Sequence, residues 1–125
     1  MNAKTKVLIV DDSPELLGAV KLFLETKSYE VNTIVDPRLL VAELKNNKPD
    51  ITILDIFLNG MGDGREICRT LKSDDETKNI PVILMSSDYK VLEYYKESLA
   101  DAMIPKPFKI GELIKVIDSL SLNKN

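Results

Sequence analysis

Five short runs of strand-forming residues alternate along the chain with segments whose apolar positions have helical spacing. The expected strands span residues 6–10, 30–34, 51–54, 80–85 and 102–104. The expected helices span residues 14–27, 37–45, 65–72, 90–99 and 110–120. Repeated strand-then-helix units predict a parallel sheet with helices on both faces, because each right-handed crossover places its helix on one side or the other.

Polar side chains follow four of the expected strands where each strand ends. Asp11 and Asp12 follow the first strand, Asp55 the third, Ser86 the fourth and Lys106 the fifth. Ligands of such sheets bind beyond the carboxyl ends of the strands. Each residue alone also has an ordinary explanation, since acids favour helix starts, Ser and Asp favour turns, and a lysine can pair with one acid. Together they predict a charged site that the fold assembles.

Composition narrows the chemistry of this site. The chain has 125 residues, 44% of them apolar, which predicts one domain over residues 1–125. The net charge is -3 and basic residues form no dense cluster, so no nucleic-acid partner is expected. No signal segment or membrane-length apolar run occurs, which predicts a cytoplasmic protein without a membrane partner. With no His and only Cys68, expected in the core, any metal would be a hard cation on carboxylates.

The motifs at the strand ends have counterparts in one known family. Val10-Asp11-Asp12, Leu54-Asp55, Ser86 and Lys106-Pro107-Phe108 together resemble the receiver domain of two-component response regulators, over essentially the whole chain. The resemblance implies a flavodoxin-like, doubly wound α/β fold with five parallel strands in the order 2-1-3-4-5. It also implies a cis bond between Lys106 and Pro107. No effector domain follows the last expected helix, so a stand-alone receiver is expected, with a fragment of a larger regulator as the alternative.

Three carboxylates within contact range predict a divalent cation. Like charges a few ångströms apart raise one another's pKa, and a hard cation such as Mg2+ resolves the conflict while accepting phosphate oxygens. Asp12 is the expected direct ligand, Asp11 acts largely through water, and Asp55 completes the acidic set. The resemblance adds the backbone carbonyl of Phe57 as a further ligand, and Mn2+ is expected to substitute for Mg2+.

The resemblance implies that Asp55 accepts a phosphoryl group from a sensor histidine kinase or a histidine phosphotransfer protein. Phosphoryl transfer depends mainly on positioning and charge neutralisation. The Lys106 ammonium and the Ser86 hydroxyl are expected to contact the phosphoryl oxygens. The chain is therefore expected to be a signalling receiver that assists its own phosphorylation and dephosphorylation, and not an enzyme with a separate substrate. Phe57 and Asp88 are expected to tune dephosphorylation, because they would flank the path of attacking water.

Two departures from the family pattern concern the switch and the loop after Asp55. Met103 stands where the family usually has an aromatic switch residue, so a thioether would have to repack instead. Asn59 stands where a proline is typical, and the loop that contains Gly62 and Gly64 is one residue longer than usual. The geometry of this loop is therefore less predictable than the site.

Partner surfaces are expected in two places. The resemblance places the output on the face formed by the fourth helix, fifth strand and fifth helix, where Tyr94 and Tyr95 cannot both point to the core. In the first helix, apolar pairs that include Phe23 make the stripe wider than one packed face requires, so part of it is expected to face a partner. The expected partners are a phosphodonor and a downstream protein, and the chain is expected to be a monomer or a weak, phosphorylation-dependent dimer.

The sequence also bears on three protein classes other than the receiver. A protein-interaction module that is never phosphorylated would keep the fold and lose site residues, yet all of them are present. A hydrolase of the haloacid dehalogenase type would need a second acid two residues after its nucleophile on the first strand, and here that position is Ser13. P-loop nucleotide binding is disfavoured because no Gly-rich loop ending in Gly-Lys-Ser/Thr follows the first strand.

Overall fold

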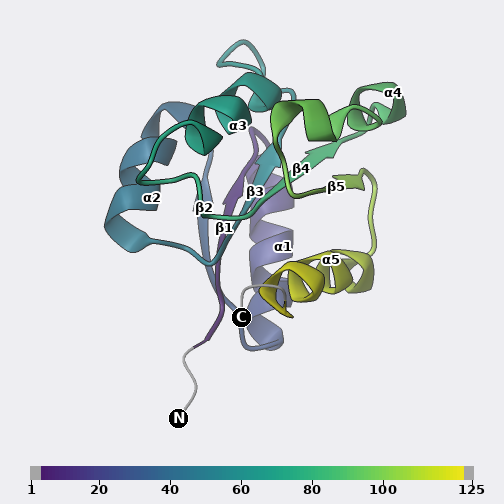
Figure 1. Ribbon diagram of the computed structural model, residues 1–125. Coiled ribbons are helices and arrows are strands. Elements are labelled where there is room, and N and C mark those ends of the chain that lie inside the picture. Colours follow the sequence, from purple (N-terminus) through teal and green to yellow (C-terminus); the bar gives the residue numbers. More distant parts are fainter. Residues whose placement is uncertain (1–3, 123–125) are drawn as a thin grey trace.

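A computed structural model of the protein describes residues 4–122 and shows five parallel strands connected by helices (Figure 1). The strands are β1 (Lys6–Val10), β2 (Glu30–Ile34), β3 (Ile51–Asp55), β4 (Val82–Ser86) and β5 (Ala102–Pro105). The helices are α1 (Pro14–Thr26), α2 (Leu40–Asn47), α3 (Gly64–Lys72), α4 (Tyr89–Leu92) and α5 (Ile110–Leu122), with 3-10 turns η1 (Pro37–Leu39) and η2 (Tyr95–Ser98). The sheet has the order β2-β1-β3-β4-β5, which confirms the predicted fold class and strand order.

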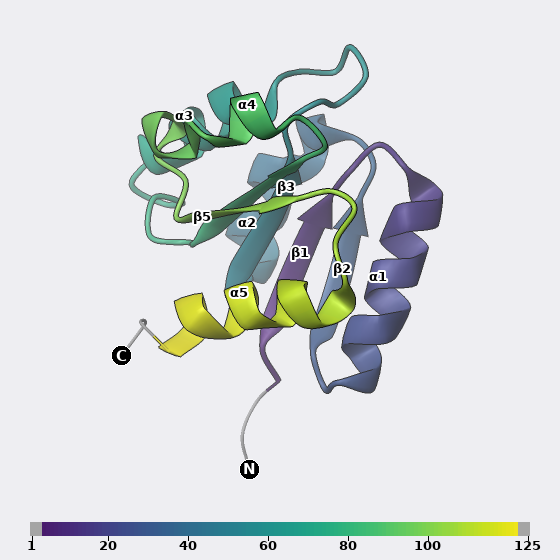
Figure 2. The ribbon, with the colours of Figure 1, turned by 90° about the vertical axis from the view of Figure 1, so that its right-hand side faces the viewer.

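The two faces of the sheet carry separate hydrophobic clusters. Successive side chains of a strand point to opposite faces, so Leu8 and Val10 of β1 join residues of α2 and α3, whereas Val7 and Ile9 join residues of α1 and α5. Figure 2 shows the helices in these two layers, on either side of the sheet. Every residue of β3 and β4 is buried, as expected for strands covered on both faces.

Cys68 lies in the cluster under α2 and α3 and is 0% exposed, as predicted for a core residue. Burial raises the pKa of its thiol to about 11, so the reactive thiolate is scarce at neutral pH. None of the helices over residues 4–122 combines the length and apolar character that a membrane span requires.

Three predicted elements differ from the structure: one helix is divided, and one strand and one helix start differently. The predicted helix over 90–99 is wrong as one helix, because it is divided at Tyr94, whose ψ of 25° leaves the helical region. Among the side chains that the structure describes in this segment, Val91 and Tyr95 pack on the adjacent core, which is little apolar surface to hold a continuous helix. The strand predicted from residue 80 begins at Val82, after Pro81. The helix predicted from Pro37 starts as η1 and becomes α-helical at Leu40.

Candidate functional site

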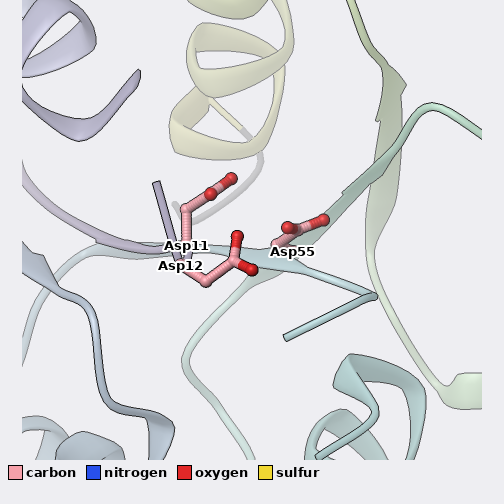
Figure 3. A group of neighbouring side chains, drawn as sticks. All are labelled: Asp11, Asp12 and Asp55. Carbon is pink, nitrogen blue, oxygen red and sulfur yellow. The ribbon is translucent and has the colours of Figure 1, made fainter. Parts of the chain in front are cut away.

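The acidic side chains meet at the carboxyl edge of the sheet. Asp11 and Asp12 follow β1 and Asp55 ends β3, and these two strands are neighbours with Val10 paired to Leu54. One oxygen from each of the three carboxylates lies within 4.8 Å of the others. Figure 3 shows the three side chains grouped at the ends of the two strands. The structure therefore brings together the acids that the sequence analysis placed in one site.

Lys106, which follows β5, reaches the same cluster. Its Nζ donates a hydrogen bond of 2.7 Å to Asp11 Oδ2 and lies 3.3 Å from Asp55 Oδ2. Its main-chain N–H donates to the Ser86 carbonyl at 2.9 Å, which ties the end of β5 to the end of β4. The Lys106–Pro107 bond is cis, as predicted.

Burial and charge perturb the ionisable groups of the site. Burial raises the pKa of Asp55 to about 6; the nearby Lys106 ammonium opposes this rise, and the charges of Asp11 and Asp12 add to it. For Lys106, burial alone would lower the pKa, but the hydrogen bond to Asp11 and the charge of Asp55 raise it above the ordinary value. Lys106 thus stays charged. Its single positive charge does not balance the negative charge of the three carboxylates around it.

The donor set fits a hard divalent cation. Asp11 is already engaged, since Oδ1 accepts from the Ser13 N–H at 2.9 Å and Oδ2 accepts from Lys106. Asp12 is half-buried and, within residues 4–122, its carboxylate accepts no hydrogen bond. A carboxylate without a protein partner beside two others is the kind of ligand that Mg2+ takes while keeping several waters. The direct role of Asp12 and the indirect role of Asp11 stay predictions.

Ser86 and Asp88 form a short chain of contacts that leads away from the site. Ser86 ends β4, is 1% exposed, and its Oγ accepts from the Asp88 N–H at 3.0 Å. A hydroxyl that accepts one bond can still donate its own proton. The Asp88 carboxylate caps α4 by accepting from the N–H groups of Lys90 and Val91. Asp88 therefore has a structural task in addition to the rate-tuning role predicted for it.

The loop between β3 and α3 holds the second rate-tuning candidate. Phe57 is 49% exposed and forms an isolated antiparallel bridge with Asp63, whereas Leu58 is buried in the core. The backbone of this loop turns through left-handed conformations at Asn59 and at two glycines. Both ends of the loop are thus fixed, and its exposed Phe57 stands two residues beyond Asp55. The third candidate, Met103 in β5, is half-buried and packs against the core under α2 and α3.

An apolar groove opens between α1 and the segment that links β5 to α5. It encloses about 730 Å³ and has both Ser87 and Lys106 in its lining, so one end reaches the lysine of the acidic cluster. The remaining lining residues are Leu16, Ala19, Val20, Phe23 and 107–110. Phe23 is 53% exposed although Leu17 and Leu24 of the same helix are buried. The wide apolar stripe predicted for this helix thus lines a groove, which the sequence alone did not reveal.

Comparisons with known proteins agree with this geometry. A family model described as the response regulator receiver domain matches residues 7–118. The chain belongs to this family. It is 37% identical over 109 residues to the heme response regulator HssR of Staphylococcus epidermidis, covering 86% of this chain and 47% of HssR. The chain therefore spans about half the length of that relative.

Solved receiver structures have the same fold. The signal receiver domain of a signal transduction histidine kinase from Syntrophus aciditrophicus is similar with a TM-score of 0.86 and 32% identity, over 97% of this chain and 92% of that one. The chemotaxis response regulator CheY4 of Vibrio cholerae has a TM-score of 0.85 and 27% identity, over 94% of this chain and 99% of that one. The similarity covers nearly all of both chains, so the receiver fold is shared without large insertions.

Replacing the buried acid of this receiver domain should stabilise the metal-free fold in a pH-dependent way. The pKa of Asp55 is raised from 3.8 to about 6 in the folded state, so the wild type loses stability as the pH rises through this interval. The full effect corresponds to roughly 3 kcal/mol. Asp55→Asn also removes one partner of Lys106, so we expect a gain of about 2 kcal/mol above pH 6 that disappears below pH 4.

Urea unfolding in EDTA, followed by circular dichroism, measures this difference. Asp75→Asn is the matched control, because the Asp75 side chain is 93% exposed and its loss should change the unfolding free energy little. An Asp55→Asn variant that is less stable than the wild type at pH 7 would contradict the expectation.

Proposed function

We propose that this receiver domain, spanning residues 1–125, accepts a phosphoryl group on Asp55 from a histidine kinase or a histidine phosphotransfer protein in the presence of Mg2+. The observation that carries the proposal is the buried Asp55 carboxylate, which lies at a strand end with Lys106 Nζ 3.3 Å away and two further acids beside it. The phosphorylated form then changes its binding to a downstream protein through the face formed by α4, β5 and α5.

In the transfer step, an Asp55 carboxylate oxygen attacks phosphorus and the phosphorus–nitrogen bond to the donor imidazole breaks, so the electron pair of that bond returns to the donor. Asp12, Asp11, Asp55 and the Phe57 carbonyl would hold Mg2+, which supplies positive charge to the carboxylates and phosphoryl oxygens. Lys106 contributes a second positive charge, because its ammonium already contacts Asp55 and can turn from Asp11 to a phosphoryl oxygen. The Ser86 hydroxyl donates its proton to another phosphoryl oxygen.

The Ser86 hydroxyl links this step to the output face. In the resting form its Oγ accepts from Asp88, the residue that caps α4. Reorientation of Ser86 toward the phosphoryl group would alter this contact and shift the start of α4. Tyr94 is 59% exposed beyond α4 while Tyr95 packs on the core, so Tyr94 is the tyrosine that would contact a downstream partner.

The groove beside α1 is the proposed docking place for the donor protein. Its lining includes Lys106 and Ser87, so a protein seated in it would stand next to Asp55. The exposed Phe23 ring supplies apolar area that such a partner can bury.

The direct test of the acceptor is intact-mass spectrometry after incubation with Mg2+ and acetyl phosphate. We expect one phosphoryl adduct that is lost with EDTA and absent from Asp55→Asn, because Asp55 lies beside the Lys106 ammonium and two further acids, whereas both oxygens of Asp11 already accept hydrogen bonds. Asp75→Asn, on the exposed surface, should be labelled like the wild type. No adduct on the wild type would favour an interaction module that is never phosphorylated, and an adduct that survives in Asp55→Asn would place the acceptor elsewhere.

Phe23→Ala should separate docking from chemistry. With a phosphorylated histidine phosphotransfer protein that labels the wild type, we expect the transfer rate to fall by about tenfold, as for loss of an aromatic contact worth roughly 1 to 2 kcal/mol. With acetyl phosphate, which needs no docking, the rate should not change. Leu39→Ala is the control, because Leu39 is 59% exposed on η1, outside the groove. Equal losses with both donors would show that Phe23 acts through the fold and not through docking.

Phe57 and Asp88 are expected to set the lifetime of the acyl phosphate. Phe57→Asn replaces an apolar ring two residues beyond Asp55 with a group that can bind attacking water. The decay rate should rise several-fold, because one additional hydrogen bond to that water lowers the barrier by about 1 kcal/mol. Asp88→Asn keeps a capping side chain for α4 and removes the charge near the water path, so any change in decay reports charge and not helix loss. Decay of the adduct after removal of acetyl phosphate measures both, and unchanged lifetimes in the two variants would remove these residues from the mechanism.

A further inference from the structure

The first residue of α3 is a buried glycine that lies against the main chain of Asp55. A Cβ atom at Gly64 would overlap the Asp55 carbonyl oxygen and lie 2.9 Å from Ile56 Cα and 3.0 Å from the Asp55 carbonyl carbon. All three are main-chain atoms, so no side-chain rotation could make room. The φ of Gly64 lies outside the left-handed region, which means that glycine is required here for space and not for an unusual dihedral angle.

Both sides of this contact are held in place from elsewhere. The Gly64 N–H donates to the Ile56 carbonyl at 2.7 Å, and the Ile56 N–H donates to the Met85 carbonyl of β4 at 3.0 Å. On the helix side, Cys68 and Leu71 anchor α3 in the core and are 0% and 2% exposed. A methyl group at position 64 would therefore have to displace either the anchored helix or the peptide that joins Asp55 to Ile56.

Displacement of that peptide would move the acceptor. The Asp55 carboxylate is placed against Lys106 Nζ at 3.3 Å, and the Phe57 carbonyl follows two residues later on the same backbone. Rates of group transfer fall steeply when reacting groups are misplaced by about 1 Å, up to about a hundredfold. The geometry points to Gly64 as a positioning residue for phosphorylation: its bare Cα lets α3 press on the main chain of Asp55 and fixes where the acceptor carboxylate lies. This inference rests on the proposed role of Asp55.

The chain offers a matched control for this contact. Gly111 lies in the first turn of α5, as Gly64 does in α3, but a Cβ atom there has no neighbour within 4 Å. Gly64→Ala and Gly111→Ala therefore make the same chemical change in the first turn of a helix, and only the first of them meets the main chain of Asp55.

The experiment compares these variants in two measurements on the folded chain. With Mg2+ and acetyl phosphate, the rate of adduct formation should fall by about tenfold or more in Gly64→Ala and stay at the wild-type value in Gly111→Ala. Without a phosphodonor, isothermal titration with Mg2+ should show affinity reduced by about tenfold in Gly64→Ala alone. Wild-type rates and Mg2+ affinity in Gly64→Ala would overturn the inference.

A purely structural role for Gly64 is tested with Leu71→Ala, which loosens the other end of α3 without touching Asp55. Rates are compared at a temperature where circular dichroism shows each variant folded, and Leu71→Ala should then be labelled at nearly the wild-type rate. An equal loss in Leu71→Ala would show that only the stability of α3 matters and would also overturn the inference.

Unfolding of Gly64→Ala and failure of the proposed function can each be told apart from loss of positioning. If Gly64→Ala is unfolded in buffer, all variants are measured in trimethylamine N-oxide, which favours the compact state. A variant that stays unfolded there shows a structural requirement alone and contradicts positioning. Failure of the proposed function has another signature, because the wild type and Gly111→Ala would then form no adduct, or Asp55→Asn would still form one.

Discussion

The burial of the Asp55 carboxylate is the constraint on which the carboxyl edge of the sheet depends. Burial raises the pKa of this group to about 6, and the one nearby ammonium, on Lys106, opposes only part of the rise. The resting site therefore has three carboxylates against one cation, packed where water cannot screen them well. Such a site favours the binding of a further cation, which together with Lys106 would supply the positive charge that a transferred phosphoryl group needs.

Hydrogen bonds at the ends of β4 and β5 also connect the site to the start of α4. The Lys106 N–H binds the Ser86 carbonyl, and the Ser86 hydroxyl accepts from Asp88 at the start of α4. In contrast to α3, which two buried side chains anchor, α4 extends only over Tyr89–Leu92. A small change at Ser86 would thus act first on a short helix, whereas α3 is anchored in the core.

Prediction from sequence succeeded where a local pattern has one structural meaning. The apolar runs that end in polar residues predicted the strands, and the family resemblance predicted their order in the sheet. The polar residues at the strand ends predicted the acidic cluster with Lys106. It failed where packing decides: the break at Tyr94 follows from scarce contacts with the core, which residue spacing does not reveal. The groove beside α1 joins segments distant in sequence, and the contact of Gly64 with Asp55 depends on how the loop between them folds, so only coordinates show them.

The segment after α4 also carries backbone strain. Leu99 has a φ of 67° and is 52% exposed, although a non-glycine residue in the left-handed region costs on the order of 1 kcal/mol. Strain and exposure together lower the free energy needed to rearrange the chain between α4 and β5. A phosphoryl group shifts a two-state equilibrium only by its differential interaction with the two states, which is a few kcal/mol for new charge-assisted hydrogen bonds. The chain between Ser86 and β5 contains this exposed and strained residue, so it would need little free energy to rearrange.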